Sequence, residues 1–318
     1  MCPGYIDGLG AGFWIGLPPV IHFSKPAVKA KVVPEVLRGN KRICLAITEP
    51  QAGSDVANIL TTATLTPDGR HYLVTGQKKW ITNGMFADYF VTVVRTGGPG
   101  MKGITMMLIE RDEETVETKI IKSSYSHAAG TALVIFNETK VPVENVFGEV
   151  NAGFKCVVQN FNHERWIILI AVQQYMRNMV DQSFKWLSQR KAFNKPLTDQ
   201  PVLRHKLARM VAATEAVHAW MEQTTYQMNV MSFKEMNDNL GGHLALLKYE
   251  TTRAATLVGD DVVQLFGGRG VTKSNMGKYV ERFHRAYKIF SVYGGSEEIM
   301  ADLGVRQALR TMDPHVRL

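Results

Sequence analysis

The sequence predicts an α+β protein with three parts: a short helical segment, a β-rich region and a bundle of long helices. Residues 43–150 carry short β-branched and aromatic runs between turn signals, as strands do. From residue 151 onward the apolar residues recur with the period of helices. Residues 1–42 mix glycine and proline with one helical pattern. We therefore divide the chain at residues 42 and 150, into segments 1–42, 43–150 and 151–318.

In the N-terminal segment, a helical pattern covers Ala27 to Leu37, and Gly39 follows its end. Before it, glycines and prolines such as Gly8, Gly10 and Pro18 break up the apolar residues. This segment is therefore predicted to be the last part of a helical region.

The central region contains a series of predicted strands. These are Ile43–Thr48, Leu60–Leu65, Tyr72–Thr75, Tyr89–Arg95, Ile104–Ile109 and Thr131–Phe136. The turn sequence Pro67-Asp68-Gly69 joins the second and third strands as a hairpin. Short strands without long helices between them predict a small antiparallel β-barrel or β-sandwich.

The C-terminal region is predicted to be a four-helix bundle. Apolar residues mark one face of its first helix: Phe154, Val157, Phe161, Ile168, Val172, Tyr175 and Met179. Three more helical stretches follow, at Pro201–Val230, Lys234–Phe266 and Tyr279–Arg310. Long amphipathic helices in succession pack most simply as a bundle.

Composition and charge limit the class of protein. The 318 residues include 45% hydrophobic and 21% charged residues, which is typical of a folded globular protein. The net charge of +8 favours an anionic partner, whether nucleic acid, acidic lipid or a phosphorylated cofactor. No apolar run approaches the roughly 18 residues of a membrane span, so we expect none.

The three cysteines, Cys2, Cys44 and Cys156, are too scattered for a disulfide framework. Together with an N-terminus that lacks a secretory signal pattern, this predicts an intracellular protein. The C-terminal Val316-Arg317-Leu318 resembles a peroxisomal address without its small first residue, so an ordinary tail is the alternative.

Glu164 is the candidate catalytic residue. It lies three residues after Phe161 and four before Ile168, which places a carboxylate within the apolar face of the helix. Burial there raises the pKa of a carboxyl group, as a general base working near neutrality requires. The alternative is a structural ion pair with Arg165 or with an arginine on another helix.

Three further segments have both a functional and a structural interpretation. Thr48–Asp55 leaves a strand with hydroxyl groups and small residues, which suits an anion site or an ordinary turn. Gly76–Gly84 places Trp80 and Thr82 on one side of an extended segment, where the indole could carry a flat cofactor or fill the core. Phe266–Gly270 allows close approach of a ligand or caps a helix.

Several common catalytic motifs are missing from the sequence. It contains no Walker loop, HExxH, GxSxG or strand–GxGxxG–helix pattern. The histidines show no clustering typical of a metal site, and basic residues lack the aromatic interleaving of a single-strand nucleic-acid surface. The sequence therefore predicts neither a nucleic-acid partner nor a metal site.

Seven sequence strings resemble the flavin-dependent acyl-CoA dehydrogenase family, in that family's order: LAITEPQAGSD, GQKKWITNG, VPVENVFGE, NHERW, QRKAFNKPL, VVQLFGGRGV and VYGGSEEI. The closest similarity is to a fungal-type branch of the family. The resemblance implies a helical domain, a central β-domain and a C-terminal four-helix bundle, with residues 1–42 as the last part of the first domain.

The resemblance also implies FAD as cofactor and an acyl-CoA as substrate. It places Ile47, Thr48, Trp80 and Thr82 at the flavin. It assigns the FAD pyrophosphate and adenosine, across a subunit interface, to Arg190, Phe193, Gln264 and Gly268, and further FAD contacts to Ser296 and Glu298. It assigns substrate contacts to Ser54, Arg165, Gly294 and Gly295.

In this family the catalytic glutamate occupies either a late motif or the first bundle helix. The late motif here reads Tyr293-Gly294-Gly295-Ser296, without the glutamate, and Glu164 occupies the alternative position, as in the isovaleryl and long-chain branches. The implied reaction is α,β-dehydrogenation: Glu164 removes the α-proton, and flavin N5 accepts the β-hydride. The backbone N–H of Gly294 is implied at the thioester carbonyl oxygen.

Some residues depart from the family pattern. Ala192 replaces a hydroxyl residue, Pro201 stands where a glutamine is common, and Tyr125–Gly130 lacks the usual Gly-x-Arg. Two alternatives therefore stay open: a flavin oxidase that uses oxygen, and a truncated, non-catalytic scaffold that binds a partner.

The resemblance implies an electron-transfer flavoprotein or another electron acceptor as partner, and a homodimer or homotetramer. For the compartment, it leaves the mitochondrial matrix, the peroxisomal matrix and the cytoplasm open.

Overall fold

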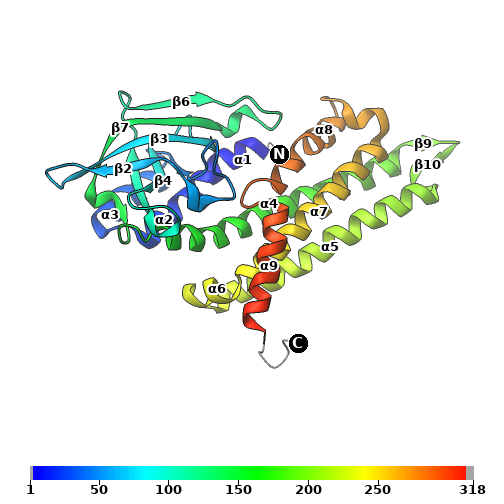
Figure 1. Cartoon of the computed structure of the whole chain (residues 1–318). Coiled ribbons are helices and arrows are strands. Elements are labelled where there is room, and N and C mark those ends of the chain that lie inside the picture. Colours follow the sequence, from blue (N-terminus) through cyan, green and yellow to red (C-terminus); the bar gives the residue numbers. More distant parts are fainter. Residues whose placement is uncertain (1–2, 313–318) are drawn as a thin grey trace. The chain divides into compact units, whose positions relative to one another are not determined.

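The computed structural model of the protein describes residues 3–312 (Figure 1). Its contacts divide the described chain into two structural units, one up to His163 and one from Glu164 onward. The boundary falls inside one long helix, α4 (Gly153–Gln189). We describe each unit by itself, and the division into three segments predicted from the sequence stays a prediction.

The first unit begins with helical segments: α1 (Pro3–Gly10), a π-helical stretch (Ala11–Gly16), α2 (Leu17–Phe23) and α3 (Pro26–Leu37). Of these, the sequence analysis predicted α3. The glycines here permit close packing. A Cβ atom at Gly12 would lie 3.2 Å from the carbonyl oxygen of Ile43, and one at Gly16 would lie 3.1 Å from the backbone of Cys44. Glycines that looked like turn signals therefore bring a helix against a strand.

A mixed sheet forms the rest of the first unit. Its strands are β1 (Ile43–Ala46), β2 (Thr62–Leu65), β3 (His71–Ile81), β4 (Tyr89–Arg95), β5 (Ile104–Glu110), β6 (Val116–Ile120), β7 (Ala132–Pro142) and β8 (Val146–Phe147). Among the described residues their order is β6-β7-β3-β2-β4-β5-β8, with β1 beside β4. Most neighbours are antiparallel, as predicted, but β1 and β2 both pair with β4 in parallel.

The sheet separates two apolar cores because successive side chains of a strand point to opposite faces. On β4, Val91 and Val93 join a core with Val20 and Val32 of the helices. Phe90, directly before Val91, points to the opposite face and joins the other core with residues of β3 and β7. Both faces of β4 are thus buried, and its apolar sequence explains why its predicted bounds are confirmed.

The second unit is helical. Beyond α4 it contains α5 (Pro201–Val230), α6 (Phe233–Asn239), α7 (Gly241–Phe266), α8 (Gly277–Ala286), α9 (Glu297–Thr311) and a short hairpin of β9 (Lys191–Ala192) and β10 (Lys195–Pro196). In Figure 1, α7 packs along α5 and crosses α9. The apolar core of the second unit includes Met176, Val258, Val262 and Phe290.

Two predicted helices are each interrupted. The predicted Lys234–Phe266 helix splits at Leu240 into α6 and α7. A capping box of Ser232 and Glu235 starts α6. The predicted Tyr279–Arg310 helix splits into α8 and α9. Between them, Gly294 and Gly295 have φ angles of +66° and +97°, which a helix does not contain.

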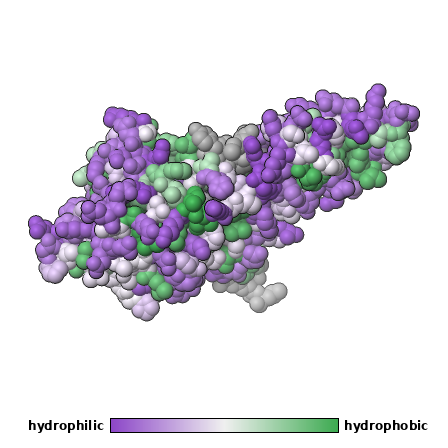
Figure 2. Space-filling model, turned by 90° about the horizontal axis from the view of Figure 1, so that it is seen from above, coloured by the Kyte–Doolittle hydropathy of each residue, from purple (hydrophilic) through white to green (hydrophobic). Residues whose placement is uncertain are grey.

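The surface in Figure 2 is mainly hydrophilic, with separate hydrophobic areas. Large apolar side chains that stay exposed include Trp80 and Phe193. Across residues 3–312, none of the helices combines the length and the apolar character needed to cross a membrane.

Candidate functional site

Glu164 lies on α4, and its side chain is withdrawn from water. Its Oε2 atom is buried and has no hydrogen-bond partner among residues 3–312. Burial raises the pKa of Glu164 to about 7, while the nearby cations Arg165 and Lys248 act in the opposite direction. The carboxyl group is therefore able to exchange a proton near neutral pH, as the sequence predicted.

Gly294 lies beside this carboxylate. A Cβ atom added at Gly294 would lie 3.8 Å from Oε1 of Glu164 and only 2.4 Å from Cδ1 of Ile168. Its φ angle of +66° also disfavours any residue with a side chain. The structure thus brings together Glu164 and Gly294, two residues that the sequence analysis placed at the same reaction.

The turn that contains Gly294 leads directly into α9. Ser296 is the N-cap residue and Glu298 lies in the first turn. Hydrogen bonds from its own backbone N–H and from Ser296 lower the pKa of Glu298. Ser296 follows Gly295 directly and Glu298 lies two residues further on, but a contact with FAD stays a prediction for both.

Arg165 and Lys248 complete the charged surroundings of Glu164. Arg165 is buried, with 7% of its surface exposed. The contact of this residue with CoA stays a prediction. Lys248 on α7 is fully buried, and its ammonium group donates to the carbonyl oxygens of Phe290 and Gly295.

The sequence analysis missed Lys248. The signal that could have found it is the one that singled out Glu164: a charge at helical spacing from apolar residues, here Leu244, Ala255 and Val258.

In the first unit, the ends of β1 and β3 lie side by side. The backbone N–H of Lys79 donates to the carbonyl oxygen of Thr48 at 2.8 Å. Ile47 and Thr48 therefore lie next to the segment of Trp80 and Thr82, as their predicted common role at the flavin requires. Ser54 is exposed on the loop that follows β1.

Trp80 departs from the predicted extended segment. Its φ angle is +66°, and the pairing of β3 with β7 shifts register between Lys78 and Ile81. The regular alternation that would place Trp80 and Thr82 on one side is therefore interrupted, and Thr82 lies in the turn after the strand. The indole is 54% exposed, with Nζ of Lys79 4.9 Å from its ring centroid. It does not fill the core, which was the alternative.

Beneath this segment, Lys78 and Glu49 form a buried ion pair with 2.7 Å between Nζ and Oε1. Lys78 also donates to the carbonyl oxygens of Ile47 and Val93. Glu49 accepts from the backbone N–H groups of Leu60 and Thr61. The pair ties the segments after β1 and before β2 to β3 and β4 and so supports the predicted flavin residues.

The four residues assigned to the distal part of FAD gather at one end of the helical unit. Arg190 and Phe193 follow α4, and Gln264 and Gly268 lie at the end of α7. Trp186 connects the two helix ends, because its Nε1 donates to the carbonyl oxygen of Leu265 and its ring stacks on Phe266. Gly267, with a φ angle of +59°, caps α7, so the glycine-rich segment does end a helix.

These residues fit a cofactor with flat rings and phosphates. The side chain of Phe193 is 90% exposed, and Arg190, Gln264 and Gly268 are exposed as well. A Cβ atom at Gly268 would meet nothing within 4 Å, which leaves room for a ligand against the backbone. Open aromatic rings at Trp80 and Phe193 would accept stacking rings, and the Arg190 cation would accept a phosphate.

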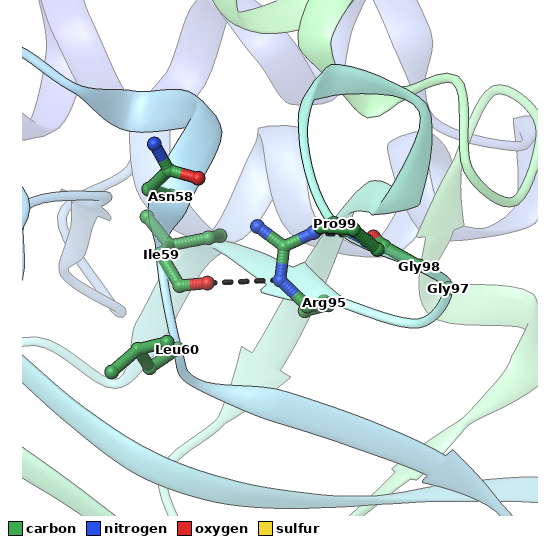
Figure 3. A pocket seen from close by; sticks show the side chains of 7 residues that line it. All are labelled: Asn58, Ile59, Leu60, Arg95, Gly97, Gly98 and Pro99. Carbon is green, nitrogen blue, oxygen red and sulfur yellow. Dashed lines mark hydrogen bonds between the residues drawn. The ribbon is translucent and has the colours of Figure 1, made fainter.

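A pocket of about 370 Å³ in the first unit lies apart from these residues (Figure 3). It is lined by Asn58, Ile59, Leu60, Arg95, Gly97, Gly98 and Pro99. The guanidinium group of Arg95 donates to the carbonyl oxygens of Ala57, Ile59, Gly98 and Gly100. Arg95 therefore clamps two loops together, and none of the predicted site residues lines this pocket.

No group of His, Cys, Asp and Glu residues in the described part of the chain is arranged to hold a metal ion.

Comparisons with known proteins define the class first. Residues 44–139 match the middle domain of acyl-CoA dehydrogenases, and residues 151–309 match their C-terminal domain. The class is that of oxidoreductases acting on acyl-CoA. The chain belongs to the acyl-CoA dehydrogenase family, whose members are FAD-dependent flavoproteins.

Two fungal relatives illustrate the similarity. The chain is 41% identical over 308 residues to the acyl-CoA dehydrogenase apdG of Emericella nidulans, which covers 96% of this chain and 70% of that protein. It is 34% identical over 312 residues to the acyl-CoA dehydrogenase AFT10-1 of Alternaria alternata, covering 98% of this chain and 72% of that protein. The expected similarity to a fungal-type branch agrees with both.

Among solved structures, butyryl-CoA dehydrogenase from Megasphaera elsdenii superposes with a TM-score of 0.89 at 27% identity. The match covers 97% of this chain and 79% of that chain. The predicted α+β architecture of N-terminal helices, β-domain and helical domain is confirmed.

Proposed function

We propose that the protein dehydrogenates an acyl-CoA thioester between Cα and Cβ, with Glu164 as the base that removes the α-proton. The observation that carries this proposal is the position of Glu164: its Oε1 lies beside Gly294, and its Oε2 is buried without a hydrogen-bond partner among the described residues. A buried carboxylate with unused acceptor capacity, next to a residue without a side chain, is able to accept a substrate proton.

Each residue of the proposed site has one role in the reaction, which follows from the chemistry of that residue. Bound FAD supplies the acceptor for the β-hydride. Glu164 takes the α-proton, and the electron pair of the broken C–H bond moves toward the thioester carbonyl. The backbone N–H of Gly294 donates to that carbonyl oxygen and stabilises the negative charge as it develops. Gly295 and Ser54 contact the thioester and the chain that leads to CoA.

A second part of the proposal concerns the residues that contact FAD. We propose that Ile47, Thr48, Trp80 and Thr82 contact the flavin ring, and that Ser296 and Glu298 contact FAD next to the catalytic turn. The exposed set of Arg190, Phe193, Gln264 and Gly268 contacts the FAD of a second copy of the chain. A homodimer or homotetramer is therefore part of the proposal, and light scattering of the flavin-loaded protein measures it.

The decisive experiment replaces Glu164 by glutamine, which keeps the shape of the side chain and removes its basicity. We expect the flavin absorption of the FAD-loaded wild-type protein to bleach when it is mixed anaerobically with butyryl-CoA or palmitoyl-CoA. We expect E164Q to lower the rate of bleaching by about 10²- to 10⁴-fold, the usual contribution of a general base. The control is E222Q, at an exposed glutamate on α5.

The outcome also separates the alternatives. Full bleaching rates in E164Q would reject Glu164 as the base. Reoxidation of the bleached enzyme by air as fast as by an electron-transfer flavoprotein would identify an oxidase. A purified chain that carries no flavin and does not gain thermal stability with added FAD would be a non-catalytic scaffold.

The electron acceptor and the compartment belong to the same proposal. We propose an electron-transfer flavoprotein as acceptor and a mitochondrial or peroxisomal matrix as location. The names of several relatives support a mitochondrial location, since they include mitochondrial very long-chain acyl-CoA dehydrogenases. Cell fractionation followed by immunoblotting tests the location, and a purely cytoplasmic signal would reject it.

A further inference from the structure

Lys248 is fully buried, although lysine is among the residues least often found inside proteins. Its Nζ atom lies 3.0 Å from the carbonyl oxygen of Phe290 and 2.7 Å from that of Gly295. Within residues 3–312 no carboxylate oxygen lies close enough to Nζ to form an ion pair. The ammonium group is thus bound to two backbone carbonyls rather than to an acidic side chain.

These two carbonyls stand on either side of the turn that presents Gly294. Phe290 belongs to the last helical turn before it, and Gly295 precedes the N-cap of α9. A single ammonium group therefore ties the entry of the turn to its exit. The two glycine residues of the turn have positive φ angles and little conformational restraint of their own.

The side chain of Lys248 also reaches the place where substrate is proposed to react. A Cβ atom added at Gly294 would lie 3.5 Å from Cε of Lys248 and 3.8 Å from Oε1 of Glu164. The lysine stem, the glycine backbone and the carboxylate thus surround one point.

The charges around Lys248 come from two other helices. Glu164 and Arg165 face it from α4, and Glu297 faces it from α9. Burial lowers the pKa of Lys248 to about 8, with Arg165 acting in the same direction and the two glutamates against it. In turn, Lys248 and Arg165 lower the pKa of Glu164, which burial raises. The protonation states of Lys248 and Glu164 are therefore coupled.

We infer that Lys248 is a positioning residue for the dehydrogenation: its ammonium group fixes the turn at Gly294 against Glu164 and places a positive charge beside the carboxylate. This inference rests on the proposed function. It adds that the charge on Lys248, and not only its volume, sets the activity.

Two substitutions separate charge from volume. K248M keeps most of the apolar stem and removes the charge, whereas K248R keeps a cation that does not titrate in proteins. The control is K206M, because Lys206 on α5 forms a partly buried ion pair with Asp261, 2.6 Å away, in the same helical unit. Each FAD-loaded variant is mixed anaerobically with butyryl-CoA or palmitoyl-CoA, and flavin bleaching is followed from about pH 6 to about pH 9.

In the wild-type protein we expect the rate to rise through about pH 7 as Glu164 ionises, and to fall above about pH 8 as Lys248 loses its charge. K248M should lower the maximal rate at least about tenfold and move the rising limb up by about one pH unit, because the carboxylate loses a neighbouring cation. K248R should restore the rising limb and remove the fall at high pH. K206M should leave both limbs in place.

A second measurement does not depend on activity. Hydrogen exchange followed by mass spectrometry should show faster exchange in peptides covering residues 290–297 of K248M than in K206M or the wild type. This readout and K248R keep the inference testable if K248M loses its flavin.

Rising limbs at the same pH in K248M and the wild type, with unchanged exchange at residues 290–297, would overturn the inference and leave Lys248 with a packing role. That result together with an inactive E164Q would leave the proposed function intact. A fully active E164Q would reject the base itself, whatever the lysine variants show.

Discussion

Both units of the chain bury a lysine near a glutamate, yet the two arrangements differ in how the acid is satisfied. In the first unit, Glu49 accepts hydrogen bonds from Lys78 and from two backbone N–H groups. In the second unit, Lys248 donates to carbonyl oxygens, and the buried Oε2 of Glu164 has no hydrogen-bond partner among the described residues.

The pKa values follow from this difference. Burial raises the pKa of Glu49, but Lys78 and the hydrogen bonds outweigh burial, so its pKa lies below the ordinary value. Burial dominates at Glu164 and raises its pKa to about 7. The comparison teaches that a buried charge alone does not mark a reactive group. A buried acid is a candidate reactive group when an oxygen of its carboxyl group has no hydrogen-bond partner.

The largest expected effect on stability comes from breaking the satisfied pair. K78M leaves the Glu49 carboxylate buried without its cation, which should lower the free energy of unfolding by about 3–5 kcal/mol. The matched control is K31M, since Lys31 and Glu110 are also 2.7 Å apart but are about half exposed. That control should cost less than about 1 kcal/mol. Urea denaturation followed by tryptophan fluorescence measures both, and equal losses would contradict the role assigned to burial.

The second prediction has the opposite sign. The folded-state pKa of Glu164 lies above that of an unfolded glutamate, so the stability linked to it is present at low pH and is lost as pH rises through about 7. E164Q removes this loss and should stabilise the protein at pH 8 by about 1–3 kcal/mol. The loss begins near the ordinary pKa of 4.5, so at about pH 4 the difference should nearly vanish.

E49Q is the matched variant for this test, because it removes the same charge from a satisfied site. It should destabilise the protein at pH 8. A destabilised E164Q at pH 8, measured by thermal unfolding of the flavin-free chain, would show that Glu164 is a structural acid like Glu49.

The smallest expected effect concerns the space beside Glu164. G294A should cost about 1 kcal/mol more than G69A, because the new methyl group has to displace Ile168 as well as adopt a positive φ angle. Gly69 has a φ angle of +68°, close to that of Gly294, but nothing within 4 Å of its Cβ position. Equal costs in the two variants would show that the space at Gly294 is larger than the structure has it.

The elements with strong local patterns were predictable from the sequence. Strand β4 and helix α5 begin and end where the apolar runs and proline indicated, and Glu164 was found because a carboxylate interrupts an apolar stripe. The N-terminal helices were not, since their glycines serve tertiary contacts that no local pattern reports. Strand β6, Val116–Ile120, was missed because charged residues alternate with apolar ones at its partly exposed position.

The site was predictable only in part, because tertiary contacts bring together residues that are far apart in the sequence. Lys248 and Glu164 are far apart in the sequence, and their relation depends on how α4, α7 and the turn before α9 pack. The bend at Trp80 likewise depends on a register shift between β3 and β7, which alternation along one strand does not reveal.

That bend has a consequence for ligand binding. Trp80 is held in a backbone conformation that unfolded chains rarely adopt, and the sheet on which it stands fixes that conformation before any ligand arrives. An aromatic plane ordered in advance loses little conformational entropy when another ring stacks on it. The folding of the β-domain thereby orders the exposed indole for stacking.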